Sequence, residues 1–150
     1  EPVADLRVKH SRLKGVNVPK NIVASMIDEF PILAVLAAVA EGKTEMKGIG
    51  ELRVKESDRI FSMATGLREC GVVVSSGDDH MTVEGVRRVK GGQLINTFND
   101  HRIAMSFICL GQVTQKPIQI SESISIGTSF PGFIEKFKEI GANLSSQKNQ

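Results

Sequence analysis

The chain has 150 residues, of which 41% are hydrophobic and 24% are charged, and its formal net charge is +2. This length and composition are typical of a folded domain with a real core. So small a net charge, with no aromatic residues interleaved with basic ones, gives no reason to expect nucleic acid or an anionic membrane as a partner. The longest apolar run, residues 31–40, is too short to span a bilayer.

The two cysteines, Cys70 and Cys109, each fall in an apolar stretch with a helical pattern. Neither belongs to a CxxC motif or to a cysteine–histidine cluster, so we expect no metal site. Two reduced, mostly buried thiols are typical of a reducing compartment such as the cytoplasm. The chain has no initiator methionine and its strand-like pattern begins at once, so we expect it to be a piece of a longer protein.

Hydrophobic periodicity predicts a series of short elements in the first half of the chain. In chain order they are a strand at 6–9, an apolar helix over 31–40 opened by Asp28, a strand at 44–46, a helix over 57–70 that ends at Gly71, and strands at 72–75 and 81–84. Glycine and aspartate in the segment 76–79 suit a tight turn, so we expect the last two strands to form a hairpin.

The second half repeats this order. Asp100 opens an apolar helix over 103–110, a strand follows at 117–120, and a helix over 129–140 ends at Gly141. We therefore predict an α/β fold of repeated βαβαββ units whose central helices are shielded by sheets. The boundary falls near Lys90, which gives a first unit over residues 1–90 and a second, incomplete unit over residues 91–150.

The two kinds of helix should be buried differently. The helices over 31–40 and 103–110 are apolar on almost every side, so we expect both to be buried all round. The helices over 57–70 and 129–140 carry a single apolar stripe, so each should cover a surface with that stripe.

Two charged clusters, residues 53–59 and 99–102, stand out from this pattern. Each ends in an arginine, Arg59 or Arg102, placed two residues after a good helix-capping residue. A helix start already carries partial positive charge, so an added cation is unfavourable there unless an anion binds. The clusters therefore indicate a site for an anionic ligand, and two arginines suit a ligand that bears both a carboxylate and a phosphate.

Residues 52–55 alternate between apolar and basic, as on a half-buried strand, and Ser57 is a good cap for the helix that follows. This arrangement would gather Lys55, Glu56 and Arg59 at a strand-to-helix junction, where α/β proteins often bind ligands.

A structural interpretation stands beside the functional one. A run of mixed charges is most often a solvated helix start, and Asp28 and Asp100 are each explained as helix caps. His101 fits a structural histidine at the first helical position. On the residues alone, both interpretations stay open.

Four motifs, at residues 51–59, 99–105, 25–31 and 128–131, resemble signatures of the 5-enolpyruvylshikimate-3-phosphate synthase family (3-phosphoshikimate 1-carboxyvinyltransferase), in particular its glyphosate-tolerant bacterial branch. The resemblance runs nearly end to end in the correct order. It covers only the C-terminal portion of the family's chain.

The resemblance implies a fold of two domains, each built from three βαβαββ units with helices inside. It implies transfer of the enolpyruvyl group of phosphoenolpyruvate to the 5-hydroxyl of shikimate 3-phosphate, with release of phosphate, in the shikimate pathway of aromatic amino acid biosynthesis. It implies a cytoplasmic, monomeric parent enzyme that uses no metal and no organic cofactor.

The resemblance also assigns roles to site residues. Asp28 would be the base near the 5-hydroxyl and a contact to shikimate 3-phosphate, and Glu56 would move the proton at C3 of phosphoenolpyruvate. Lys55 would contact the shikimate side. Arg59 and Arg102 would bind the carboxylate and phosphate of phosphoenolpyruvate and stabilise charge in the transition state.

Two features depart from a complete family site. Many members carry a lysine where this chain has Thr128, so one cation that contacts phosphoenolpyruvate is unassigned. His101 is expected to orient Arg102 rather than to react. The family's site lies between two domains, so the remainder of the parent is needed and we expect this chain alone not to turn over. The alternatives are a fragment of the related UDP-N-acetylglucosamine enolpyruvyl transferase, or a non-catalytic anion-binding repeat domain with its charged groups in unrelated patches.

Overall fold

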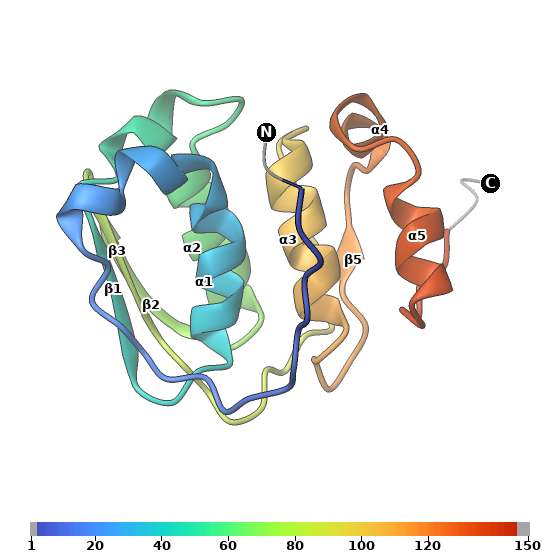
Figure 1. Cartoon of the computed structure of the whole chain (residues 1–150), viewed down its shortest axis with the longest axis horizontal. Helices are drawn as coiled ribbons and strands as arrows, with labels where there is room; N and C mark the ends of the chain where they lie inside the picture. The colour runs from blue at the N-terminus through green and yellow to red at the C-terminus, as the bar shows by residue number, and fades with distance from the viewer. Residues whose placement is uncertain (1–2, 147–150) are drawn as a thin grey trace.

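A computed structural model describes residues 3–146 and shows a layered α/β arrangement (Figure 1). A three-stranded sheet lies at one side, and the helices α1 (Phe30–Ala38) and α2 (Arg59–Glu69) pack on its inner face. The helix α3 (His101–Gly111) follows. It contacts α1 on one side, and on the other side it contacts the strand β5 (Gln119–Ile120) and the helix α4 (Ile124–Ser129). The predicted α/β class is therefore confirmed.

The helices are short and the strands shorter. The α-helices are α1 Phe30–Ala38, α2 Arg59–Glu69, α3 His101–Gly111, α4 Ile124–Ser129 and α5 Phe133–Glu139. The 3-10 helices are η1 Lys20–Ile22, η2 Ala24–Glu29 and η3 Gly50–Val54. The strands are β1 Lys43–Lys47, β2 Val73–Gly77, β3 His80–Glu84, β4 Leu94–Ile95 and β5 Gln119–Ile120.

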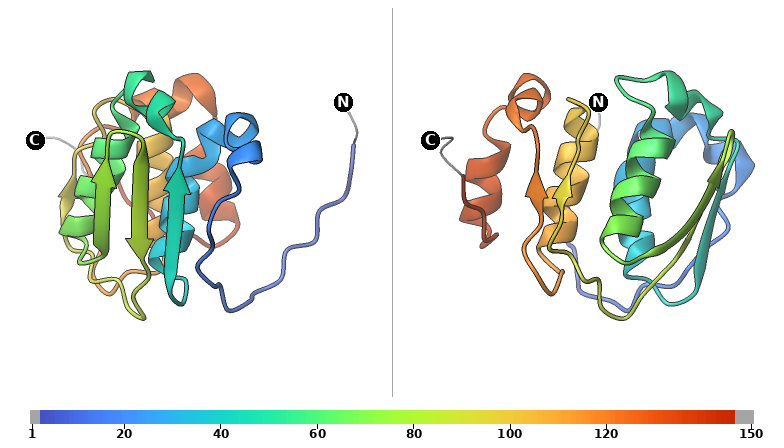
Figure 2. Two further views of the ribbon diagram at one scale, coloured as in Figure 1. Left: turned by 90° about the vertical axis from the view of Figure 1, so that its left-hand side faces the viewer. Right: turned by 180° about the vertical axis from the view of Figure 1, so that it is seen from behind.

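The larger sheet has the strand order β1-β3-β2, and both strand pairs are antiparallel (Figure 2). The predicted hairpin is confirmed, since β2 and β3 pair from Val73 opposite Glu84 to Gly77 opposite His80. The second sheet is the parallel pair of β4 and β5. Side chains alternate in burial along β1 and β3, and Met46, Met81 and Val83 face the helices as core residues.

The central helices are buried on most sides, but the prediction that both are buried all round is wrong for α1. In α1 the residues Phe30, Ala34 and Ala38 are fully buried, but Leu36 remains 46% exposed. The helix α3 buries Ile103 and Phe107 completely. Some apolar surface of α1 therefore faces outward within the described part of the chain.

The strand predicted at residues 6–9 is wrong. The segment is extended, reaches away from the body and belongs to no sheet (Figure 2). Leu6 is 89% exposed and Val8 is 93% exposed. An alternating pattern forms a strand only when a neighbour supplies hydrogen-bond partners. Further along, Lys14 and Asn17 make isolated parallel bridges beside β1.

The helix predicted over residues 129–140 is also wrong in its extent. The structure has two helices, α4 and α5, separated at Pro131 and Gly132. Gly132 has a φ of 79°, which is left-handed, so the helix cannot run through it. Proline disfavours helical geometry at Phe130, which has a φ of −136°.

Both cysteines are free thiols, as predicted. Cys70 is buried, and its burial raises the pKa of its thiol to about 11. Cys109 is only partly buried, and desolvation raises the pKa of its thiol too. Within residues 3–146, no helix combines the length and the apolar character that crossing a bilayer requires.

The two helices that carry the charged clusters touch at a glycine. A Cβ atom added at Gly66 of α2 would lie 2.4 Å from Cζ of Phe107 in α3. The absence of a side chain at Gly66 therefore lets α2 and α3 approach closely, and this approach helps to set the spacing of Arg59 and Arg102.

We predict that Gly66→Ala destabilises the chain by about 1–3 kcal/mol, because overpacking against the fully buried Phe107 outweighs the better helix propensity of alanine. Urea unfolding measures the change. Gly127→Ala in α4 is the control, since a Cβ there meets nothing within 4 Å. Equal stabilities of Gly66→Ala and the unaltered chain would contradict the packing argument.

Candidate functional site

The side chain of Arg59 joins both charged clusters. Its Nε donates to Oδ2 of Asp100 at 2.8 Å, and its Nη1 donates to Oδ1 of Asp28 at 3.0 Å. Its Nη2 donates to Oε2 of Glu56 at 2.5 Å. The guanidinium is only 1% exposed, so three carboxylates surround one buried cation.

The position of Arg59 follows from local sequence. Arg59 is the first residue of α2, and the fully buried Ile60 behind it packs in the core. The helix start is capped by Asp58, whose Oδ1 accepts from the amide of Phe61 at 2.9 Å. The prediction that Ser57 caps this helix is wrong, because its hydroxyl donates instead to Oδ2 of Asp100 at 2.9 Å.

Asp100 is fully buried and does cap α3, as predicted. Its Oδ1 accepts from the amides of Arg102 at 2.9 Å and Ile103 at 3.4 Å. Burial by itself raises the pKa of Asp100, but the hydrogen bond and charge of Arg59 outweigh it, so this pKa lies below its ordinary value. Burial also lowers the pKa of Arg59, and the hydrogen bond and charge of Asp100 reverse that shift.

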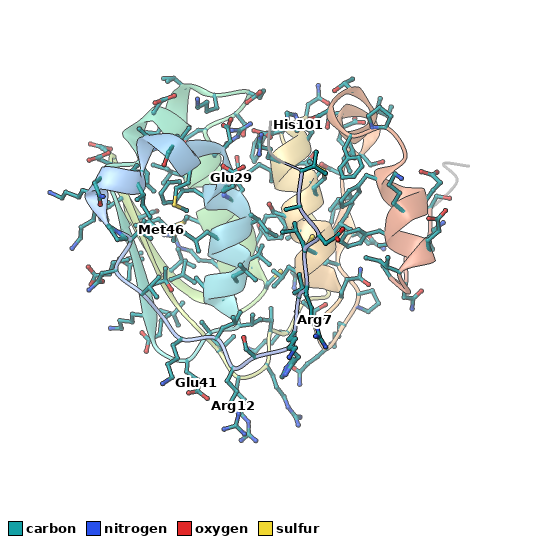
Figure 3. All side chains as sticks on the ribbon, viewed as in Figure 1. Arg7, Arg12, Glu29, Glu41, Met46 and His101 are labelled. Atoms are coloured by element: carbon teal, nitrogen blue, oxygen red, sulfur yellow. The ribbon has the colours of Figure 1, made fainter. Side chains whose placement is uncertain are left out.

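Arg102 lies one residue into α3 and reaches across to η2. Its Nη1 donates to the backbone oxygen of Asp28 at 3.0 Å, and its Nη2 lies 3.7 Å from Oδ2 of the same residue. Glu29 is a further neighbour, with its Oε1 at 3.8 Å from Nη1. His101 at the start of α3 and Glu29 before α1 lie at the same end of the molecule (Figure 3).

Asp28 therefore bridges the two arginines. Its side chain is 42% exposed, so it is open to solvent and to a ligand. The prediction that Asp28 caps the following helix is wrong, because the N-cap is Glu29, which makes no capping side-chain bond. The carboxylate of Asp28 contacts Arg59 and Arg102 instead, and hydrogen bonds to cations are stronger than those to neutral helix amides.

Lys55 lies beside this group. Its Nζ donates to Oε1 of Glu51 at 2.5 Å, and this hydrogen bond raises the pKa of Lys55 above its ordinary value. The charge of Asp28 acts in the same direction, while that of Arg59 opposes it. Lys55 is therefore a cation at neutral pH, suited to contact an anion and not to act as a base.

The strand predicted over residues 52–55 is wrong, because residues 50–54 form the 3-10 helix η3. The helix is anchored to the hairpin turn, since the amide of Gly50 donates to Oδ1 of Asp79 at 2.6 Å. Arg53 also serves the fold, donating from Nη2 to the oxygen of Gly77 at 2.7 Å and from Nη1 to Oδ2 of Asp58 at 2.5 Å. Arg53 therefore does not join the group around Arg59.

The structure brings together the predicted residues Asp28, Glu56, Arg59 and Arg102, with Lys55 at the edge. This arrangement argues against charged groups in unrelated patches. Asp100 and Glu29 were not predicted as site residues. For Asp100 the signal was its place in the same cluster as Arg102, but its capping role explained the residue fully on sequence alone. Thr128 donates to the oxygen of Ser125 at 2.7 Å and supplies no cation.

We call this group of six side chains the arginine cluster. It consists of two arginines, Arg59 and Arg102, and the carboxylates of Asp28, Glu29, Glu56 and Asp100. Its two cations face four anions, so the cluster as it stands is net negative. An anionic ligand can bind there only by replacing carboxylates on the arginines or with cations from elsewhere.

Comparisons with known proteins agree on one family. Residues 1–137 match the family described as EPSP synthase (3-phosphoshikimate 1-carboxyvinyltransferase). The chain is 53% identical over 146 residues to the 3-phosphoshikimate 1-carboxyvinyltransferase of Paramagnetospirillum magneticum, covering 97% of this chain and 33% of that protein. With the protein of the same name from Parvibaculum lavamentivorans the identity is 56% over 145 residues, covering 96% and 32%.

A solved structure is also similar. The structure of EPSP synthase from Acinetobacter baumannii superposes with a TM-score of 0.85 at 43% identity, covering 90% of this chain and 32% of that one. The chain therefore spans about a third of the length of the relatives that it matches.

The Asp100–Arg59 pair predicts a pH dependence of stability. Because the pKa of folded Asp100 is lowered from 3.8, the pair stabilises the fold above that pH and loses this contribution as the pH falls further. We expect Asp100→Asn to cost roughly 3 kcal/mol at pH 7 and markedly less near pH 3. Urea unfolding of both proteins measures the difference, and a cost independent of pH would contradict the ion-pair explanation.

Proposed function

The chain belongs to the EPSP synthase family, and from this premise we propose that it supplies the C-terminal half-site of an enzyme that transfers the enolpyruvyl group of phosphoenolpyruvate to shikimate 3-phosphate. The observation that carries the proposal is the arginine cluster. Arg59 and Arg102 come from separate helices, and Asp28 bridges them. Two cations that share one bridging carboxylate suit a ligand with two anionic groups.

The proposed roles follow the chemistry of the transfer. The 5-hydroxyl must lose a proton as it attacks C2 of phosphoenolpyruvate, while C3 gains a proton. The tetrahedral intermediate then expels phosphate as C3 loses a proton. Asp28 is the proposed base at the hydroxyl and Glu56 the proposed proton carrier at C3, since both are exposed carboxylates beside Arg59.

The arginines are proposed to bind phosphoenolpyruvate directly. Arg59 and Arg102 would hold its carboxylate and phosphate and stabilise the charge that develops when phosphate leaves. Lys55, whose raised pKa keeps it charged, would contact the shikimate side. No metal or organic cofactor is needed in this scheme, because the steps are proton transfers and an addition–elimination.

The charge balance supports the need for the rest of the parent protein. The arginine cluster holds more anions than cations, so a dianionic ligand would bind it weakly without added positive charge. Thr128 supplies none. We therefore propose that further cations come from the part of the parent outside this sequence, and that this chain alone does not turn over.

Two further features of the parent are also proposed. Residues 1–90 and 91–150 are two βαβαββ-type units of one domain, supported by the separate sheets that the structure has over 43–84 and 94–120. The parent is proposed to be cytoplasmic, supported by the two free thiols. That it is a monomer is proposed from the family resemblance alone.

The direct test is a titration of the chain with phosphoenolpyruvate, followed through the arginine side-chain signals in NMR spectra. We expect shifts at Arg59 and Arg102, and no steady phosphate release when shikimate 3-phosphate is added. Steady release would overturn the half-site claim. Equal shifts with UDP-N-acetylglucosamine would favour the related transferase, and shifts confined to other arginines would remove the proposed site.

We predict that Glu56→Gln makes the isolated chain bind inorganic phosphate roughly twofold to fivefold more tightly. The substitution removes a competing charge that lies 2.5 Å from Nη2 of Arg59 and is half exposed. Isothermal titration at low salt measures the affinity. Glu139→Gln, an equal change of charge at an exposed position on α5, is the control and should leave the affinity unchanged. Weaker phosphate binding by Glu56→Gln would contradict the competition.

A further inference from the structure

We propose that Asp100 is a positioning residue of the anion site. Its buried carboxylate fixes both the guanidinium plane of Arg59 and the first turn of α3. This inference rests on the proposed function of the arginine cluster. It assigns to Asp100 a task that helix capping alone does not describe.

The guanidinium of Arg59 has two usable edges, and the structure treats them differently. The Nε and Nη2 atoms face Asp100, with distances of 2.8 Å to Oδ2 and 3.4 Å to Oδ1. The Nη1 and Nη2 atoms face Asp28 and Glu56. Asp100 is fully buried, whereas the side chains of Asp28 and Glu56 are 42% and 52% exposed. The first edge is therefore fixed, and the second can exchange its carboxylates for a ligand.

The same carboxylate fixes the backbone of the second arginine. Oδ1 of Asp100 accepts from the amide of Arg102, and Oδ2 accepts from Ser57 at the other cluster. The carboxylate that orients Arg59 therefore also caps the helix that carries Arg102. One side chain thereby fixes the guanidinium of Arg59 and the backbone from which Arg102 extends, and so helps to set the distance that a ligand with two anionic groups must match.

The loop before Asp100 is held in a costly conformation. Phe98 has a φ of 51° and Asn99 a φ of 57°, and a left-handed conformation is unfavourable for phenylalanine in particular. The ring of Phe98 packs edge-on against Phe61 of α2 at 5.9 Å between centroids. Thr97 is fully buried and donates to the oxygen of Glu122 at 3.1 Å. These contacts over-determine where Asp100 lies.

The test compares Asp100→Asn with Thr97→Val in the chain as it exists. The asparagine keeps a side-chain oxygen for the cap but loses the charge that holds Arg59. The valine removes a buried hydrogen bond from the same loop and leaves the Arg59 contacts in place, so it reports a merely structural loss.

The first measurement is proton exchange at Nε–H of Arg59, followed by NMR at one pH. We expect slow exchange in the unaltered chain and in Thr97→Val, and exchange at least about tenfold faster in Asp100→Asn, because a buried charged hydrogen bond protects this proton. Equal protection in Asp100→Asn and the unaltered chain would overturn the proposal.

The second measurement separates geometry from charge. Acetate can accept both bonds of an arginine fork and chloride cannot, although both carry one negative charge. We expect the ratio of acetate affinity to chloride affinity to fall roughly threefold in Asp100→Asn and to stay unchanged in Thr97→Val. An unchanged ratio in both variants would contradict a positioning role.

Failure of the proposed function and failure of the role of Asp100 give different results. If the unaltered chain binds neither phosphoenolpyruvate nor acetate, the half-site fails, while the exchange at Nε–H still decides the role of Asp100. If Asp100→Asn does not fold, Ser57→Ala takes its place, because it removes one hydrogen bond to Oδ2. Ser57→Ala should then speed the exchange by a smaller factor, and no change would overturn the proposal.

Discussion

The rest of the site depends on the ion pairs that the buried guanidinium of Arg59 makes with three carboxylates. A cation that is 1% exposed requires compensating anions, and the chain supplies three of them from three separate segments. Those partners draw η2, the residues before α2 and the start of α3 to one point. The ion-pair network therefore sets the geometry of the site, at one end of helices that pack through an apolar core.

The elements with strong local sequence signals were predictable from sequence. The elements whose conformation depends on contacts with other segments of the chain were not. The hairpin of β2 and β3 follows from alternation and turn residues, and the buried α1 and α3 follow from their apolar composition. The segment at 6–9 has the alternation of a strand but no neighbour to pair with. The alternating run over residues 52–55 is too short to distinguish a strand from the 3-10 helix that forms there.

The sequence indicated most members of the arginine cluster, but not Asp100 or Glu29 and not the contacts that join them. Charge at helix starts indicated Arg59 and Arg102, and the charged run before α2 indicated Lys55 and Glu56. The family resemblance added Asp28 and the role of each residue. Sequence spacing could not show that Asp100 pairs with Arg59, since they lie far apart in the chain and capping already explained the aspartate. The observed contacts place the chain's own carboxylates on the two arginines that our proposal assigns to phosphoenolpyruvate.

The most direct measurement is a crystal structure of the chain grown with saturating phosphoenolpyruvate. Our account predicts the anion between Arg59 and Arg102, with the carboxylates of Asp28 and Glu56 moved off the exposed edge of Arg59 and Asp100 still bound to its other edge. An anion bound elsewhere, or an arginine cluster that keeps all its carboxylate contacts at saturation, would contradict it.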